Sequence, residues 1–103
     1  MKLLESIKLG GHSIKNRMAM APMTRSRADI NGVVGNSTIL YYTQRTSAGL
    51  IISEAINVSE QAIGSPLTPG IYTNEQIEAW KKVTKAVHKV AVKKGIISLN
   101  FSL

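Results

Sequence analysis

Residues 18–27 read MAMAPMTRSR, an apolar segment that runs directly into a proline, a threonine and two arginines. A short, continuously apolar segment is typical of a strand that is buried on both faces, as strands of parallel sheets are. Residues 50–55, LIISEA, have the same character, because an apolar run ends in a serine, a glutamate and an alanine. Groups that follow such strands lie at the carboxyl edge of the sheet, where α/β barrels keep their functional residues. Two strands of one parallel sheet are therefore predicted, at about residues 18–22 and 50–55.

A helix is predicted after each of these strands. The first covers about residues 37–48, with Asn36 or Ser37 as its N-cap and Gly49 at its end. The second covers about residues 74–89 and begins at a capping box that Thr73 and Gln76 form. Its apolar residues recur at helical spacing and define a buried stripe. The loop before it is long, and loops of this length in compact folds are usually functional.

The ends of the chain complete a strand-helix alternation. A Gly10-Gly11 dipeptide between two short β-prone segments predicts a tight hairpin, because both residues tolerate positive φ. Residues 95–101, GIISLNF, read as a third strand. The order is hairpin, strand, helix, strand, helix, strand, which points to a parallel sheet with right-handed crossovers. This order alone leaves a barrel and a doubly wound sheet as alternatives, although no dinucleotide-binding glycine motif opens either helix.

The composition is that of a globular protein, with 44% hydrophobic residues and no cysteine, which excludes disulfides and thiolate metal sites. No apolar run approaches the ~18 residues of a membrane span, and no signal peptide is evident, so a cytoplasmic location is expected. The net charge is +7, and several of the lysines that contribute to it lie in or just after the second predicted helix. Since no aromatic residues alternate with these lysines, we expect a solvated helix face and no nucleic-acid partner. The two histidines lie far apart and predict no metal site.

The run APMTR at residues 21–25 closely resembles the first-strand signature of the Old Yellow Enzyme family, the FMN-dependent ene-reductases. The SEA run at residues 53–55 and the TPGIYT run at residues 68–73 resemble the same family, in the same order. The resemblance covers about residues 2–89. It implies an α/β fold, the incomplete N-terminal part of a TIM (β/α)8 barrel, since a whole barrel takes roughly 250 residues. It also implies FMN as cofactor, NAD(P)H as reductant and a small-molecule activated alkene as substrate.

The resemblance further implies which residues contact the flavin. Pro22, Met23 and Thr24 correspond to family positions whose backbone and hydroxyl lie against the ring, the hydroxyl near its O4 carbonyl. A hydrogen bond at that carbonyl tunes the reduction potential of the cofactor. Ala55 corresponds to a small residue that lets the ring approach the backbone, and Asn100 stands where the family has a glutamine at the pyrimidine edge. Without the resemblance, the first three residues are a strand terminus and Ala55 is a small residue at a strand end.

The charged residues beside these strand ends are expected to stabilise the fold and not to contact the flavin. Arg25 and Arg27 are expected to form ion pairs in their loop, because the family holds the flavin phosphate elsewhere. Glu54 is expected to form an ion pair at the rim of the barrel. No catalytic residue is predicted within the chain, since the substrate-anchoring and proton-donating residues of the family correspond to positions beyond Leu103.

Residues 1–103 are thus interpreted as the N-terminal part of one flavin oxidoreductase barrel domain. Residues 90–103 depart from the family pattern, either as a diverged third strand or through a reading-frame change. Two functions remain open. The chain is an N-terminal fragment of an FMN-binding, NAD(P)H-dependent ene-reductase, or it is a non-catalytic truncated paralogue or disrupted-gene product that binds no flavin.

Overall fold

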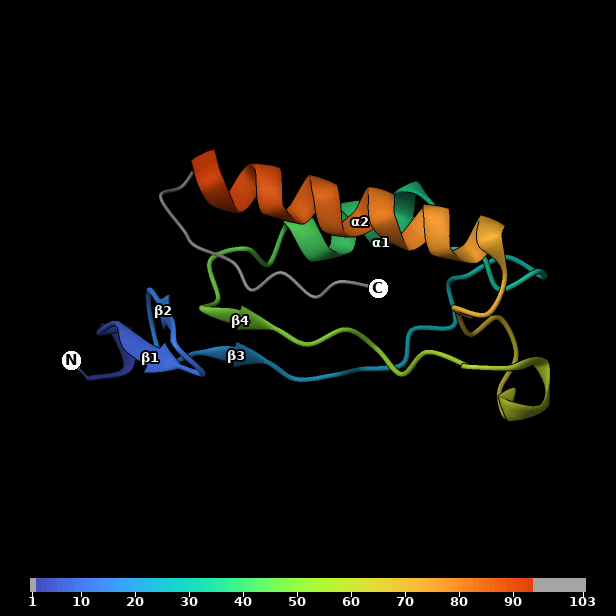
Figure 1. Cartoon of the computed structure of the whole chain (residues 1–103), viewed down its shortest axis with the longest axis horizontal. Helices are drawn as coiled ribbons and strands as arrows, with labels where there is room; N and C mark the ends of the chain where they lie inside the picture. The colour runs from blue at the N-terminus through green and yellow to red at the C-terminus, as the bar shows by residue number, and fades with distance from the viewer. Residues whose placement is uncertain (1, 94–103) are drawn as a thin grey trace.

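The computed structural model describes residues 2–93 of the chain, with the side chains of residues 2–91. The elements in chain order are η1 (Lys2–Leu4), β1 (Ile7–Leu9), β2 (His12–Ile14), β3 (Ala19–Met20), α1 (Asn36–Thr43), β4 (Leu50–Ile51), η2 (Glu60–Ala62) and α2 (Asn74–Lys93). The two helices contact each other and form a layer over one face of the β3–β4 pair (Figure 1). The observed architecture is therefore α/β, as predicted. The predicted strand at residues 95–101 lies outside the described residues.

The N-terminal hairpin is confirmed. Strands β1 and β2 pair antiparallel, with Ile7 opposite Ile14 and Leu9 opposite His12. Gly10 and Gly11 both have positive φ, at 56° and 84°. A two-residue hairpin turn that matches the twist of its strands needs positive φ at both positions, and glycine adopts it without a Cβ clash.

Strands β3 and β4 pair in parallel, with Ala19 opposite Leu50 and Met20 opposite Ile51. The backbone N–H groups of Leu50 and Ile52 donate to the carbonyl oxygens of Met18 and Met20, each at 3.2 Å. The strands are shorter than the predicted ranges 18–22 and 50–55, because the ladder ends at Ile52. Their parallel pairing is as predicted, and it brings their carboxyl ends to the same side of the molecule.

Helix α1 differs from its prediction at both ends. Its N-cap is Gly35, in extended conformation, and no side chain caps the first turn, so the expected role of Asn36 or Ser37 is wrong. The helix ends at Thr43, and turns occupy residues 44–47. Gly49 serves a close approach rather than a helix end, because a Cβ there would collide with the carbonyl oxygen of Asn16.

Asn16 fixes the start of the parallel pair. Its side-chain amide donates to the Ser47 carbonyl oxygen at 2.9 Å, and its Oδ1 accepts the backbone N–H groups of Met18 at 3.0 Å and Gly49 at 2.8 Å. The Asn16 residue is buried. One side chain therefore joins the segments that lead into β3 and β4.

The capping box of α2 is confirmed. The Thr73 hydroxyl accepts the Gln76 backbone N–H at 3.1 Å, and the Gln76 Oε1 accepts the Thr73 backbone N–H at the same distance. The helix continues to Lys93, four residues beyond the predicted end. None of the helices among residues 2–93 is long and apolar enough to cross a membrane.

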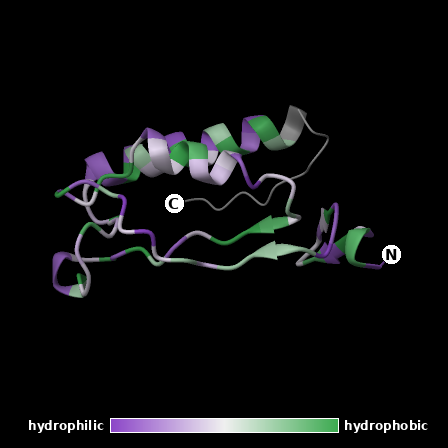
Figure 2. Ribbon diagram, turned by 180° about the vertical axis from the view of Figure 1, so that it is seen from behind, coloured by the Kyte–Doolittle hydropathy of each residue, from purple (hydrophilic) through white to green (hydrophobic). Residues whose placement is uncertain are grey.

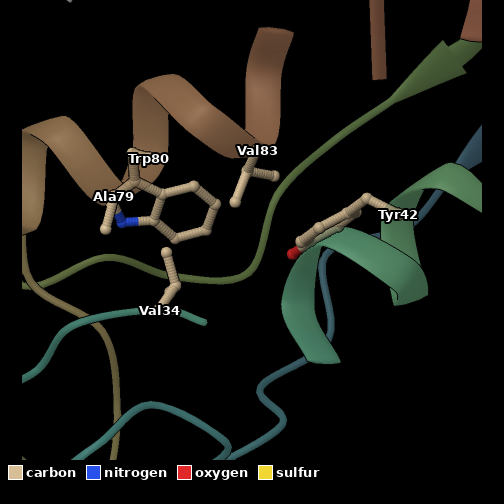
Figure 3. Close-up of a cluster of buried hydrophobic side chains, with 5 residues drawn as sticks. All are labelled: Val34, Tyr42, Ala79, Trp80 and Val83. Carbon is tan, nitrogen blue, oxygen red and sulfur yellow. The ribbon is translucent and has the colours of Figure 1, made fainter. Parts of the chain in front are cut away.

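The hydrophobic core lies between the helices and the sheet. Its buried members come from α1, α2 and the loop before α1, and they are Val34, Tyr42, Ala79, Trp80 and Val83 (Figure 3). Met20 and Ile51 pack against this cluster from the sheet. Figure 2 shows that both strands are hydrophobic along their length. Yet Met18 and Ile52 keep 45% and 43% of their surface exposed, so the predicted burial of both strand faces is not met within the described residues.

Candidate functional site

The candidate site is the carboxyl edge of the β3–β4 pair. Four residues beyond the paired Met20 and Ile51, the two segments reach Thr24 and Ala55, which are both exposed. Pro22 and Met23 are also exposed on the segment that follows β3. Because the strands are parallel, these residues leave the sheet on the same side (Figure 1). Asn100, the remaining predicted site residue, lies outside the described residues.

The groups exposed at this edge fit one side of a flat, hydrogen-bonding ring. The Thr24 hydroxyl makes no hydrogen bond within the described part of the chain and can therefore bond to a group from outside. Ala55 presents only a methyl group, which leaves room for a ring to approach the backbone. The Thr24 hydroxyl and the small Ala55 side chain are thus compatible with the edge of the predicted flavin.

A buried glutamate, Glu54, lies between the segment that follows β3 and the segment that follows β4. Glu54 is 4% exposed, and its backbone N–H donates to the Tyr42 hydroxyl at 2.9 Å. Its carboxylate Oε1 accepts the Arg25 backbone N–H at 3.5 Å. Burial raises the pKa of Glu54, against the lowering effects of the Arg25 hydrogen bond, the Arg25 charge and a hydrogen bond with Tyr42. The carboxyl group is therefore less readily ionised here than in water.

The Tyr42 hydroxyl lies in the same environment. Burial raises its pKa, although the hydrogen bond from the Glu54 backbone acts in the opposite direction. Tyr42 also belongs to the hydrophobic core, where its ring lies 6.3 Å from that of Trp80, centre to centre. Its phenol thus joins the packed interior to the strand end at Glu54.

Arg25 packs against α1 instead of forming an ion pair. Its guanidinium carbon lies 3.4 Å from the ring centre of Tyr41, and the guanidinium carbon of Arg45 lies 3.9 Å from the same ring. Such cation–π contacts attract a guanidinium to an aromatic ring. The ion pair found among residues 2–93 joins Lys81 to Glu78 at 3.3 Å. The prediction of ion pairs for Arg25, Arg27 and Glu54 is therefore wrong within the described residues.

The loops after β3 and β4 are held together at the start of α2. Gln76 is 1% exposed, and its Nε2 donates to the Asn31 carbonyl oxygen at 2.8 Å. Its Oε1 accepts the backbone N–H groups of Tyr72 and Thr73. A Cβ on Gly70 would lie 2.6 Å from the Gln76 Oε1, so the loop approaches this amide closely at a residue without a side chain. The sequence indicated Gln76 as a helix cap but not as a link between loops.

Residues 2–101 match the sequence profile of the NADH:flavin oxidoreductase / NADH oxidase family. The chain is 46% identical to 12-oxophytodienoate reductase 2 of Arabidopsis thaliana, over 84% of this chain and 23% of that protein. It is 42% identical to a protein of Leishmania infantum named probable flavin mononucleotide-dependent alkene reductase, over 92% of this chain and 25% of that protein.

The structure is similar to that of the old yellow enzyme homologue from Zymomonas mobilis. The TM-score is 0.85 at 42% sequence identity, and the match covers 96% of this chain and 27% of that one. The chain therefore spans about a quarter of the length of these relatives.

Proposed function

Because this chain belongs to the NADH:flavin oxidoreductase / NADH oxidase family, that of the Old Yellow Enzymes, we propose that it forms the flavin-contacting N-terminal part of an alkene reductase. The members of this family use FMN as cofactor and NAD(P)H as reductant. The proposed substrate is a small molecule with an activated C=C bond, and the expected location is the cytoplasm. The observation that supports the proposal most is the position of Thr24 and Ala55 at one edge of the β3–β4 pair.

Each residue of this edge has a distinct proposed task. The Thr24 hydroxyl donates to a carbonyl group of the flavin ring, with Pro22 and Met23 alongside the ring. Ala55 leaves space for the ring next to the end of β4, and Asn100 brings an amide to its pyrimidine side. Bound FMN supplies the redox chemistry, since it can take a hydride from NAD(P)H and transfer it to the alkene. In this proposal, residues 1–103 belong to one barrel domain.

The proposal is tested by titrating the purified chain with FMN. We expect bound flavin, with an absorbance band near ~450 nm that belongs to the cofactor. Thr24→Val should weaken FMN binding by about five- to tenfold, because it removes one hydrogen bond worth about 1 kcal/mol at similar volume. Ala55→Leu should weaken binding more, since its side chain occupies the space of the ring.

Thr43→Val is the matched control for the threonine substitution. Thr43 lies at the end of α1, and its hydroxyl donates to the Leu40 carbonyl oxygen within that helix. Its substitution should leave FMN affinity unchanged. A wild-type chain that binds no FMN would contradict the proposal and support the second interpretation, a non-catalytic truncated paralogue or disrupted-gene product.

A further inference from the structure

The backbone ladder does not reach the residues of the candidate site. The last hydrogen bond of the ladder joins the Ile52 N–H to the Met20 carbonyl oxygen. Beyond it, no backbone hydrogen bond joins residues 21–24 to residues 53–55 in the part of the chain that the structure describes. Thr24 and Ala55 lie in these unpaired stretches, so no backbone pairing among the described residues sets their separation.

Glu54 supplies the connection between the two strand ends. It directly precedes Ala55, and its carboxylate accepts the backbone N–H of Arg25, which directly follows Thr24. The distance of 3.5 Å is long for a hydrogen bond, but the charge of Arg25 also attracts the carboxylate. The side chain of Glu54 thus crosses from one strand end to the other.

Helix α1 contacts both Glu54 and Arg25, the two residues that this hydrogen bond joins. The Tyr42 hydroxyl accepts the Glu54 backbone N–H at 2.9 Å, which fixes the end of β4 to the helix. The Arg25 guanidinium lies on the neighbouring Tyr41 ring at 3.4 Å, which fixes the segment after β3 to the same helix. Tyr41 and Tyr42 contact each other edge to face, with ring centres 5.1 Å apart.

We propose that Glu54 and Tyr42 are positioning residues that set the distance between Thr24 and Ala55. Neither residue needs to touch a cofactor for this role, because each acts on the backbone next to a site residue. That the Thr24–Ala55 distance affects FMN binding rests on the proposed function. A buried carboxyl group is costly to maintain, and an apolar side chain would fill the same space at lower cost. Its presence beside a candidate site is consistent with a functional role.

The experiment measures hydrogen–deuterium exchange of single backbone amides in the 103-residue chain. Glu54→Ala should accelerate exchange of the Arg25 amide by about tenfold, because that amide loses its acceptor. Glu54→Gln retains an acceptor oxygen and should restore most of the protection. Tyr42→Phe should accelerate exchange of the Glu54 amide by a similar factor, since it removes only the hydroxyl. Two exposed residues provide the controls, Glu60→Ala and Tyr72→Phe, which should change neither amide.

FMN affinity is measured on the same variants. Glu54→Ala and Tyr42→Phe should weaken FMN binding by about tenfold, and Glu54→Gln should recover most of the loss. The inference is overturned if Glu54→Ala leaves Arg25 exchange unchanged, if Glu54→Gln does not restore protection, or if exchange accelerates while FMN affinity stays constant. A wild-type chain without FMN affinity contradicts the proposed function instead, and Arg25 exchange then still decides whether Glu54 holds the strand ends.

Discussion

Glu54 combines deep burial with an ionisable group. Burial disfavours its charged form, whereas the Arg25 backbone N–H, the Arg25 charge and Tyr42 favour it, and the net result is a raised pKa. Between the ordinary pKa of a glutamate and this raised value, the folded chain binds a proton that the unfolded chain has released. The free energy of unfolding must therefore fall as pH rises through that interval.

The pH dependence of stability gives a test at this residue. Glu54→Gln keeps the shape of the side chain but cannot ionise, so it should not lose stability in that interval. We expect the stability of Glu54→Gln relative to wild type to increase as pH is raised from about 4 to 7. Urea unfolding at several pH values would measure the difference, with the exposed Glu60→Gln as control. A difference that does not vary with pH would show that Glu54 has the same pKa in both states.

Helix α2 depends at its start on one amide that also organises two loops. The Gln76 side chain bonds to Asn31 in the loop after β3 and to Tyr72 and Thr73 in the loop after β4. The loops also contact each other directly, since the Gly70 N–H donates to the Gly32 carbonyl oxygen at 3.0 Å. The N-terminus of the helix and the two loops therefore form one structural unit at the carboxyl side of the sheet.

Substitution of this amide should destabilise the whole unit. Gln76→Ala removes a buried side chain and leaves the partly buried backbone groups of Asn31, Tyr72 and Thr73 without that partner. A backbone group that loses its partner away from water costs about 1–3 kcal/mol. We expect the free energy of unfolding to fall by about 2–4 kcal/mol, measured by urea denaturation. Gln61→Ala, in the exposed η2 turn, should change it by less than about 0.5 kcal/mol. A loss below about 1 kcal/mol for Gln76→Ala would mean that water replaces these hydrogen bonds.

At the scale of the molecule, the apolar surface is covered unevenly. The helices cover one face of the β3–β4 pair, while Met18 and Ile52 stay partly exposed. An apolar groove of about 500 Å³ also runs between β4 and α2, and its lining includes Ile52, Trp80, Val83, Val87 and Ala91. Exposed apolar surface and unpaired strand edges promote association between chains.

Self-association of the 103-residue chain is the expected consequence. Sedimentation should show species larger than the monomer at micromolar concentration, and Ile52→Lys should shift them toward the monomer because a charge then lies in the groove. Ile30→Lys is a stringent control, since Ile30 is 90% exposed but lies in the loop before α1, outside the groove lining. A monomeric wild-type chain, or an equal effect of both substitutions, would contradict this expectation.

The sequence alone determined the features that depend on neighbouring residues. The Gly10-Gly11 hairpin follows from the freedom of glycine at positive φ, and the capping box follows from the spacing of Thr73 and Gln76. The apolar runs predicted both strands and their parallel pairing, and the family is evident from the motifs at their ends. These signals are local because each depends on a few consecutive residues and on backbone geometry.

The contacts between distant segments depend on how the helices and strands pack in three dimensions. Asn16 fixes the start of the sheet through Gly49, 33 residues further along the chain, and this contact explains why a glycine stands there. The sequence predicts a loop ion pair for Arg25 and a rim ion pair for Glu54, but Arg25 stacks on Tyr41 and the Glu54 carboxylate accepts a backbone N–H. Composition and periodicity cannot specify such partners, because the energy of each contact depends on where the packed helices bring the side chains.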